Sequence, residues 1–231
     1  MISILAENRP TVVGVNGFAF PGAVLRLREH FEALDMAGRK KKVDLVAIEK
    51  AVRQILLAVG EDAGREGLKN TPRRVARMYE ELFSGLYEDP AAHLEVGFQE
   101  QYDEMVVLRD IPFYSMCEHH LLPFMGKAHV AYLPRGRVVG LSKIARVVES
   151  CSHRPQTQER LTSQIANMLM DKLEAKGAAV IIEATHTCMT IRGVRKPGSV
   201  MVTSAMLGTF RSNLATRNEA ITLLTGGRGG I

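Results

Sequence analysis

The spacing of apolar residues changes near Glu104, from the period of a helix to that of a strand. Before that point, apolar side chains recur every three or four residues in two stretches, after Asp44 and after Thr71. Beyond it come short extended runs, two helix-like stretches, further β-rich runs and a last helix-like stretch. This irregular order predicts an α+β fold with antiparallel pairing and argues against a regular βαβ alternation.

The helices are bounded by capping residues. We expect the first to begin at Asp44 and end at Gly60, and the second to have Thr71 as its N-cap with Pro72 in the first helical position. A later helix is expected to have Thr157 as its N-cap. This helix is expected to stop at Gly177. Two more helices are predicted over 142–151 and 213–224.

Six short runs have the composition of strands. They cover residues 105–108, 113–116, 127–133, 137–140, 178–185 and 199–206. The turn at Pro134–Gly136 lies between the third and the fourth run. We therefore expect 137–140 to pair back onto 127–133 as a hairpin.

Composition excludes several classes of protein. The chain has 231 residues, of which 46% are hydrophobic, an ordinary globular fraction that argues against disorder. Its three cysteines are not closely paired, which favours a reducing compartment over a disulfide-stabilised secreted fold. No apolar run approaches the roughly 20 residues of a membrane span, and no signal-like segment is present. We expect a soluble, cytoplasmic protein with no membrane partner.

The first 42 residues differ from the rest. Gly and Pro interrupt every apolar run there, and the segment ends in the basic run Arg39–Lys42. We expect residues 1–42 to form an arm, mobile or packed onto an oligomer, ahead of a domain over 43–231. The chain as a whole carries 30 Lys+Arg against 25 Asp+Glu, a net charge of +5, so its partner could be nucleic acid, a nucleotide or a phosphorylated metabolite.

The stretch from Cys117 to His120 has the spacing of a metal site. One turn of chain can direct both side chains to one point, and thiolate and imidazole are good zinc ligands. A third ligand is available from the stretch Thr185–Cys188, which holds a histidine and a cysteine after a β-rich run. Three protein ligands would leave a position for water, as in catalytic zinc sites, whereas Cys151 or His153 as a fourth ligand would indicate a structural site. Cys151 lies on an apolar helix face and fits a core residue better.

A second group of residues is basic. Lys143 and Arg146 lie three residues apart at the start of a predicted helix, a position that suits phosphate. Arg192, Arg195 and Lys196 follow soon after Cys188. Each of these charges by itself is more typical of a solvated surface, whereas their position around the candidate metal ligands favours a binding role to an equal degree.

Gln158 and Glu159 open the predicted helix that Thr157 caps. They either complete the helix N-terminus or bind the edge of a nucleobase. No P-loop, dinucleotide-binding glycine motif, nucleobase-deaminase signature or nucleophile elbow is present in the sequence. With 6% aromatic residues and no Trp, a base-stacking surface for single-stranded nucleic acid is poorly supported.

Five stretches, in this order, resemble the GTP cyclohydrolase I family. They are GLKNTPRRVARMY, FYSMCEHHLLPFMGKAHVAYLP, GLSKIARVVE, RPQTQERLTSQIA and THTCMTIRGVRKPGS. The resemblance runs from about Val43 to the last helix, about four fifths of the chain, and therefore implies a catalytic domain over 43–231, with helices to about 100 and the core over about 101–225.

The resemblance implies a role for each matching residue. Zinc is the implied cofactor and GTP the implied substrate. The implied zinc ligands are Cys117, His120 and Cys188. His119 and His186 would be the catalytic acid/base pair, with Ser142 near the ribose. The residues implied to hold guanine and the triphosphate are Gln158, Glu159, Lys143, Arg146 and Arg192, with Arg73 or Arg74 as a further phosphate contact.

The implied reaction is a hydrolysis followed by a rearrangement. Zinc-activated water attacks C8 of the purine, formate leaves, and the ribose is rearranged to give 7,8-dihydroneopterin triphosphate. The triphosphate is not cleaved and serves as an anchor. The resemblance also implies the tunnelling fold, in which antiparallel strands of several subunits close a barrel, and a decamer of two pentamers with active sites at subunit interfaces.

Two other interpretations compete with this one. A zinc-stabilised module that binds nucleic acid or a nucleotide would fit the basic charge and a fourth ligand at Cys151 or His153. A nitrile reductase of the same fold would need a free nucleophilic cysteine, and the arrangement of Cys117, His120 and Cys188 argues against it. We expect no nucleic-acid partner.

Overall fold

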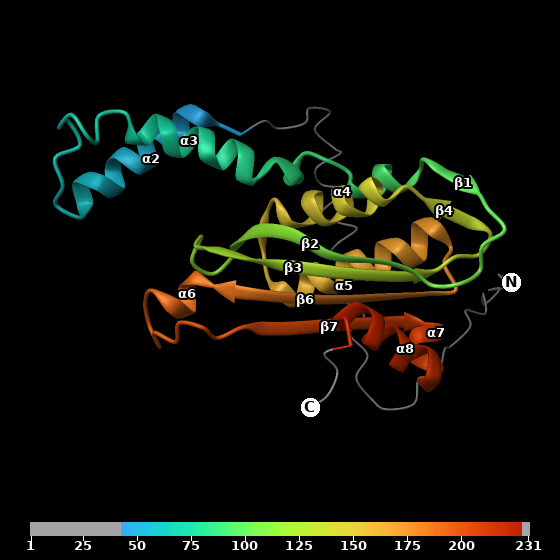
Figure 1. Cartoon of the computed structure of the whole chain (residues 1–231). Coiled ribbons are helices and arrows are strands. Elements are labelled where there is room, and N and C mark those ends of the chain that lie inside the picture. Colours follow the sequence, from blue (N-terminus) through green and yellow to red (C-terminus); the bar gives the residue numbers. More distant parts are fainter. Residues whose placement is uncertain (1–42, 228–231) are drawn as a thin grey trace, which may run out of the picture. The chain divides into compact units, whose positions relative to one another are not determined.

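The computed structural model describes residues 43–227, so the predicted arm over 1–42 lies outside the described residues. Helices and antiparallel strands follow each other irregularly, which confirms the α+β prediction (Figure 1). The helical elements are α2 (Leu45–Ala58), α3 (Thr71–Leu82), η1 (Ser84–Leu86), η2 (Pro90–Leu94), α4 (Leu141–Ser152), α5 (Gln158–Leu173), α6 (Thr187–Thr190), α7 (Thr209–Ser212) and α8 (Leu214–Thr225). The strands are β1 (Gly97–Gln99), β2 (Val106–Cys117), β3 (Pro123–Leu133), β4 (Arg137–Val139), β5 (Pro155–Gln156), β6 (Gly177–His186) and β7 (Met201–Gly208).

The main sheet has five strands in the order β5-β2-β3-β6-β7, and all neighbours are antiparallel except β2 and β5. Successive side chains of a strand point to opposite faces, so each face of this sheet builds its own core. Val130 and Tyr132 of β3 pack with α4 and α5 on one face. Ala131 of β3 and Ile181 of β6 pack with α7 and α8 on the other.

Two of the predicted strands are a single strand. The runs 105–108 and 113–116 join in β2, and the register against β3 shifts between Leu108 and Ile111. Asp110 occupies this bulge with a φ of 56°. Its backbone N–H donates to Nδ1 of His129, which gives the interrupted ladder a side-chain acceptor. The bulge is the physical reason for the break in the apolar pattern.

The predicted hairpin over 127–133 and 137–140 is wrong. β4 pairs with β1, and Phe98 lies opposite Val138. Both edges of β3 are already occupied, by β2 and by β6, so it cannot take a third partner. Gly97 allows the β1 pairing, because a Cβ there would lie 2.9 Å from the carbonyl oxygen of Val138.

The helix ends show which capping predictions hold. Asp44 caps α2 by accepting from the N–H of Ala47, and Thr157 caps α5, as expected. Thr71 is not the N-cap of α3. It is the first helical residue, after Asn70.

Gly177 is also not the end of its helix. α5 ends at Leu173, and Glu174 adopts the left-handed conformation with a φ of 50°. Gly177 instead begins β6, where a Cβ would lie 3.1 Å from the carbonyl oxygen of Leu207 and 3.1 Å from the ring of Phe210. The glycine therefore serves the close approach of β6, β7 and α7.

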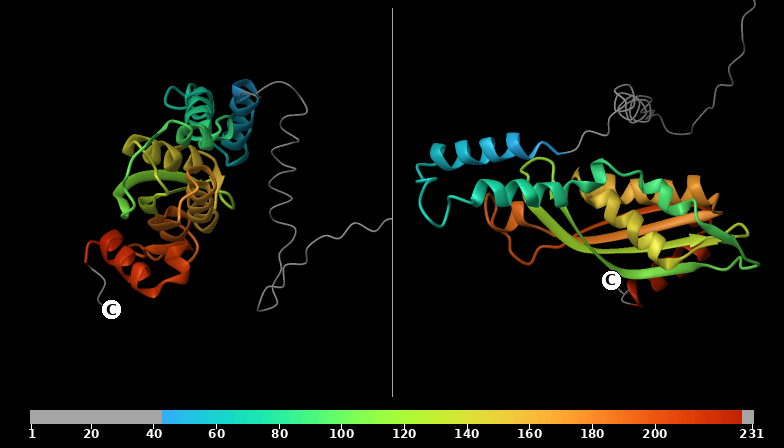
Figure 2. Two further views of the ribbon diagram at one scale, coloured as in Figure 1. Left: turned by 90° about the vertical axis from the view of Figure 1, so that its right-hand side faces the viewer. Right: turned by 90° about the horizontal axis from the view of Figure 1, so that it is seen from above.

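The helices α2 and α3 pack against each other (Figure 2). None of the residues of α2 is buried, and Val46 and Ile55 are among its exposed apolar side chains. Across residues 43–227, no helix combines the length and the apolar character needed to cross a membrane.

Candidate metal centre and active site

The sheet brings the ends of two distant strands together. β3 lies between β2 and β6 and is antiparallel to both. The end of β2 and the end of β6 therefore lie at the same end of the sheet. Phe124, near the start of β3, pairs with His186 at the end of β6. The hydroxyl of Thr187 donates to the carbonyl of Pro123 and ties the start of α6 to the same place.

The three predicted metal ligands meet at this end of the sheet. Cys117 ends β2, His120 lies on the turn that follows, and Cys188 lies on α6. One ligand atom from each lies within 4.8 Å of the others. The Sγ of Cys117 lies 3.8 Å from Nδ1 of His120. Tetrahedral zinc with ordinary bond lengths would place such atoms about 3.6 Å apart, so the group has the size of a zinc site.

A tight turn places the first two ligands. The N–H of Cys117 donates to the carbonyl of Leu122 at 2.9 Å, and the N–H of Leu121 donates back to the carbonyl of Cys117 at 2.8 Å. Leu121 takes a φ of 50° to close the turn. This backbone arrangement holds Cys117 and His120 on the same side of the loop.

The proposed fourth ligands do not join this group. Cys151 is 2% exposed within α4, and burial raises the pKa of its thiol to about 11. His153 is buried as well, with its Nδ1 3.2 Å from the hydroxyl of Ser84. Cys151 is therefore a core residue, as its helix face predicts, and the donor set among residues 43–227 has three members.

The electrostatics of the group favour a cation. Burial raises the pKa of the Cys188 thiol, the neighbouring Cys117 raises it further, and Arg192 acts in the opposite direction. Two thiolates this close repel each other unless a positive charge lies between them. The Nη1 of Arg192 lies 2.9 Å from Nε2 of His120. Because a guanidinium only donates, Nε2 accepts this bond and Nδ1 faces the sulfur.

Two further histidines lie beside the three ligands. Nδ1 of His119 lies 4.0 Å from the Sγ of Cys117, and the ring is exposed. His186 stacks on Phe124 with ring centroids 4.6 Å apart. Burial lowers the pKa of His186, and the carboxylate of Glu159 opposes that shift.

The two residues that open α5 face different surroundings. Glu159 is exposed, whereas Gln158 is 1% exposed. The side-chain amide of Gln158 binds protein groups, among them Nε2 of His186 at 2.8 Å. The structure therefore brings Gln158, Glu159 and His186 together next to the three ligands.

Sequence reasoning missed the ion pair that supports the ligand loop. Arg160 of α5 donates from both terminal nitrogens to the carboxylate of Glu118, which lies between the ligands. This hydrogen bonding lowers the pKa of Glu118. Its place between Cys117 and His119 was visible in the sequence, but the partner was 42 residues away and gave no local signal.

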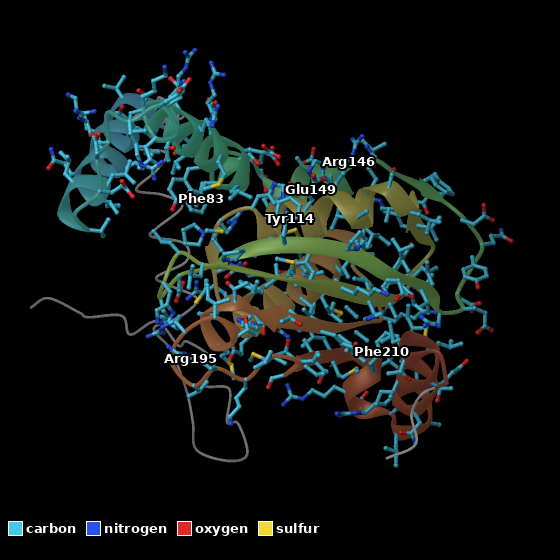
Figure 3. All side chains as sticks on the ribbon, turned by 60° about the vertical axis from the view of Figure 1, so that its left-hand side comes forward. Phe83, Tyr114, Arg146, Glu149, Arg195 and Phe210 are labelled. Carbon is cyan, nitrogen blue, oxygen red and sulfur yellow. The ribbon has the colours of Figure 1, made fainter. Side chains whose placement is uncertain are left out.

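Apart from Arg192, the residues predicted to hold ribose and phosphate are placed elsewhere. Ser142 and Lys143 lie on the first turn of α4, next to β4. The N–H of Val139 donates to the hydroxyl of Tyr132, at the opposite end of β3 from Phe124. Tyr132 is eight residue steps along β3 from Phe124, so the start of α4 lies on the order of 20 Å or more from the metal-ligand group. Figure 3 shows the two ends of the sheet through two labelled residues. Arg195, after α6, lies toward the metal end, and Phe210, on α7, lies toward the other end.

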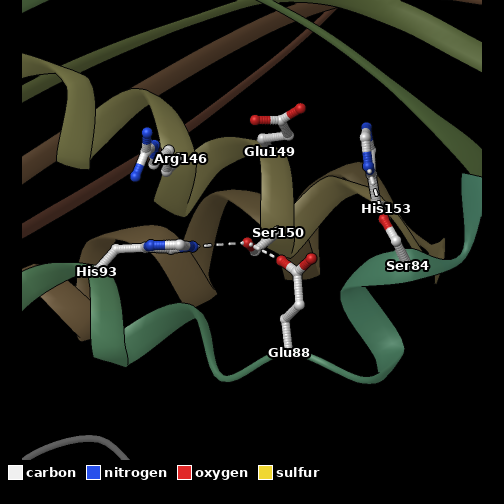
Figure 4. A pocket seen from close by; sticks show the side chains of 7 residues that line it. All are labelled: Ser84, Glu88, His93, Arg146, Glu149, Ser150 and His153. Carbon is white, nitrogen blue, oxygen red and sulfur yellow. Dashed lines mark hydrogen bonds between the residues drawn. The ribbon is translucent and has the colours of Figure 1, made fainter. Parts of the chain in front are cut away.

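Arg146 lines a polar pocket of about 250 Å³ between η1, η2 and α4 (Figure 4). There the hydroxyl of Ser150 donates to Oε2 of Glu88 at 2.7 Å and lies 3.1 Å from Nε2 of His93. Glu149 lies on the same wall. Sequence reasoning did not single out Glu88 or His93, because isolated residues in a loop and a short helix carry no spacing signal.

Arg73 and Arg74 are exposed on the first turn of α3, the helix that packs against α2. They lie on a different element from every other predicted site residue.

A Cys-His-Cys group with two adjacent histidines, at the strand ends of an α+β sheet, defines a candidate metal-dependent active site. The family model described as GTP cyclohydrolase I matches residues 48–225. The proteins named GTP cyclohydrolase 1 from Carboxydothermus hydrogenoformans and Pelotomaculum thermopropionicum are 64% and 66% identical to this chain. These alignments cover 79% and 78% of this chain and 95% and 96% of the relatives. A protein of the same name from Rhodopirellula baltica is 59% identical over 83% of both chains.

The chain therefore belongs to the GTP cyclohydrolase I family and is an enzyme of that family. The resemblance that the sequence motifs indicated is confirmed.

Proposed function

We propose that the enzyme converts GTP to 7,8-dihydroneopterin triphosphate and formate, the first step of pterin and tetrahydrofolate synthesis, with zinc as its metal. The observation that carries the proposal is the group formed by Cys117, His120 and Cys188, in a chain that belongs to this family. The names of its relatives support GTP as the substrate.

The donor set fits zinc. Two sulfurs and one imidazole nitrogen at this spacing leave a fourth position open, as in catalytic sites. Zinc, when bound, supplies a water molecule whose pKa is lowered to about 7. A ligand at Nδ1 of His120 needs a neutral ring with its hydrogen on Nε2, which can no longer accept from Arg192. With a metal held at Nδ1 of His120, the Arg192 guanidinium would be free of this bond, which fits a role in binding the triphosphate.

Residues around the metal group would orient the base and move protons. Glu159 is exposed beside His186, and its carboxylate suits the ring N–H and exocyclic amine of guanine. His119 and His186 would exchange protons with the purine while C8 is attacked and the ring opens. The stacking of His186 on Phe124 supports this role, because it holds the imidazole in one plane.

A second copy of the chain would complete the site. We assign Ser142 to the ribose and Lys143 and Arg146 to the triphosphate, with Arg73 or Arg74 as a further contact. The separation of the α4 start from the metal group supports an interface site. From the same chain, Ser142 and Lys143 are too far away to contact a GTP molecule whose purine lies at the metal group. Binding energy at the phosphates would then position C8 at the metal.

The free edges of the sheet support the barrel and the decamer of two pentamers. β7 is an edge strand, and among the described residues β2 pairs on its outer side only through Met116 and Cys117. Val202 of this edge strand is 59% exposed, and Val200, just before the strand, is 56% exposed. Unpaired edges with apolar side chains favour pairing between copies, as the tunnelling fold requires.

The test uses GTP labelled at C8 and the purified, full-length protein, with and without a zinc chelator. Chelator-sensitive release of labelled formate, with a fluorescent pterin after oxidation, is expected. Failure of the zinc-loaded, assembled protein to release formate would overturn the proposed reaction.

A further inference from the structure

We propose that Gln158 is a positioning residue that fixes the tautomer of His186, with the hydrogen on Nε2, so that Nδ1 is the nitrogen through which His186 exchanges protons. The role of that nitrogen in turnover rests on the proposed function. The tautomer itself does not, because it follows from hydrogen bonds within the chain.

The surroundings of Gln158 hold its amide in one orientation. The side chain is 1% exposed, between the start of α5 and the strands β6 and β7. Its Nε2 lies 3.0 Å from the carbonyl oxygen of Ile182 and 3.0 Å from that of Met201. Carbonyl oxygens only accept, so the amide NH₂ must face them. The amide oxygen therefore points the other way, toward His186.

A chain of hydroxyls gives the same orientation independently. The hydroxyl of Thr162 donates to the backbone carbonyl of Gln158 at 2.7 Å. Its oxygen lies 2.7 Å from the hydroxyl of Thr203, which must then be the donor, because the hydrogen of Thr162 is already used. The Thr203 oxygen is left as an acceptor, 3.1 Å from Nε2 of Gln158. A reversed amide would bring two acceptors together at this point as well.

This orientation determines which ring nitrogen of His186 carries the hydrogen. The amide oxygen of Gln158 lies 2.8 Å from Nε2 of His186. Because that oxygen only accepts, Nε2 must donate and is protonated. A neutral ring then has its free electron pair on Nδ1. Phe124, whose ring is inclined by 3° to the imidazole, fixes the plane of the ring.

The same contacts leave little of the Gln158 amide for a ligand. Its two N–H hydrogens already face three acceptors inside the protein. A guanine contact from this side chain would have to break these hydrogen bonds and leave buried polar groups unpaired, which is unfavourable. Glu159, exposed beside it, has no such constraint.

The first experiment reads the tautomer directly. The protein is labelled with ¹⁵N in its histidine rings, and the His186 signals are assigned by their loss in His186→Asn. In the wild-type protein without GTP, we expect a protonated Nε2 and an unprotonated Nδ1. In Gln158→Leu, which lacks the acceptor at similar volume, we expect the other tautomer to appear. A wild-type ring with its hydrogen on Nδ1 would overturn the proposal whether or not the protein turns over GTP.

The second experiment separates positioning from substrate binding. With the acceptor removed in Gln158→Leu, kcat should fall about 10–100-fold, the usual effect of losing an orienting partner, with KM for GTP little changed. Thr203→Val is the matched control: it alters the same buried network but leaves both carbonyls to hold the amide. It should keep the wild-type tautomer and kcat. A raised KM with unchanged kcat in Gln158→Leu would show a guanine contact and overturn the proposal.

Discussion

The metal end of the sheet and the end where α4 begins are built in different ways. At the metal end, Cys117 ends β2 and Cys188 lies on α6 just after β6, and they meet because β3 pairs with both strands. At the other end, Ser142 and Lys143 are neighbours on the first turn of one helix. The metal-ligand group lies within one chain, whereas the start of α4 lies on the order of 20 Å or more away from that group. On the proposed function, one chain would carry two halves of the site, and each half would face a different neighbour.

The largest effect is expected at the metal end, from Cys188→Ser. Loss of one sulfur from a donor set of three should remove zinc and lower turnover by more than about 100-fold, since even the partners that orient metal ligands are worth 10–100-fold. Zinc is measured by metal analysis after dialysis, and turnover by formate release.

Cys151→Ala is the matched control for this variant, because Cys151 is a buried cysteine outside the donor group. It should retain its zinc. Loss of zinc from Cys151→Ala, with retention in Cys188→Ser, would favour a structural site and contradict our assignment.

The comparison is tested most directly by mixing two impaired chains at a GTP concentration far below the raised KM of Lys143→Ala, where each variant by itself has little activity. Cys188→Ser lacks the metal half and Lys143→Ala lacks part of the phosphate half. If each site takes one half from each of two copies, co-assembled chains should form intact sites at about a quarter of positions by random association. Activity should therefore rise to about a quarter of the wild-type value when the two are unfolded, mixed and reassembled. Activity no higher than the sum of the separate variants would mean that both halves act within one chain.

A smaller effect is expected at the other end, from Lys143→Ala by itself. Loss of one charged hydrogen bond to phosphate should raise KM for GTP about 10–100-fold, with zinc content unchanged. The matched control is Lys172→Ala, which removes an exposed lysine from the last turn of α5. An equal rise in KM in both variants would show a general effect of charge and no site at the start of α4.

The two ends also differ in how far the sequence predicts them. The spacing of Cys117 and His120 indicates a shared turn, because the geometry is local. That Cys188 joins them depends on the strand order, which no local pattern contains; the family resemblance supplied it. The wrong hairpin has the same origin: the turn after Leu133 suggested a hairpin, but β6 had taken the edge that β4 would need.

Buried polar residues were the hardest to interpret. Gln158 and Glu159 are neighbours on the first turn of a helix, and no pattern in the sequence distinguishes their roles. In the structure Gln158 is enclosed by β6 and β7, whereas Glu159 stays exposed. Which of two adjacent polar side chains turns inward depends on the carbonyls available inside, here those of Ile182 and Met201.

The smallest effect is expected between the two ends, at His129 in the middle of β3. Its Nδ1 accepts the N–H of Asp110 at the bulge, at 3.2 Å. Burial lowers the pKa of His129; Asp110 and Glu183 oppose this shift, whereas Arg109 and Lys127 add to it. A protonated ring cannot accept the bond. Because the pKa is lower in the folded than in the unfolded protein, this contribution to stability is present above the unfolded pKa and is lost as the pH falls.

His129→Asn offers a similar acceptor that does not titrate. Between about pH 7.5 and about pH 5.5, the wild-type free energy of unfolding should fall by about 1 kcal/mol more than that of the variant, the usual value of one hydrogen bond. Both proteins keep the same metal ligands, so acid-induced loss of metal cancels in the difference. Denaturant unfolding at both pH values measures it. Because His129 belongs to neither half of the site, KM for GTP and zinc content at about pH 7.5 should stay at their wild-type values. A change in either would mean that the bulge transmits strain to one of the two ends, and the two halves would then not be independent.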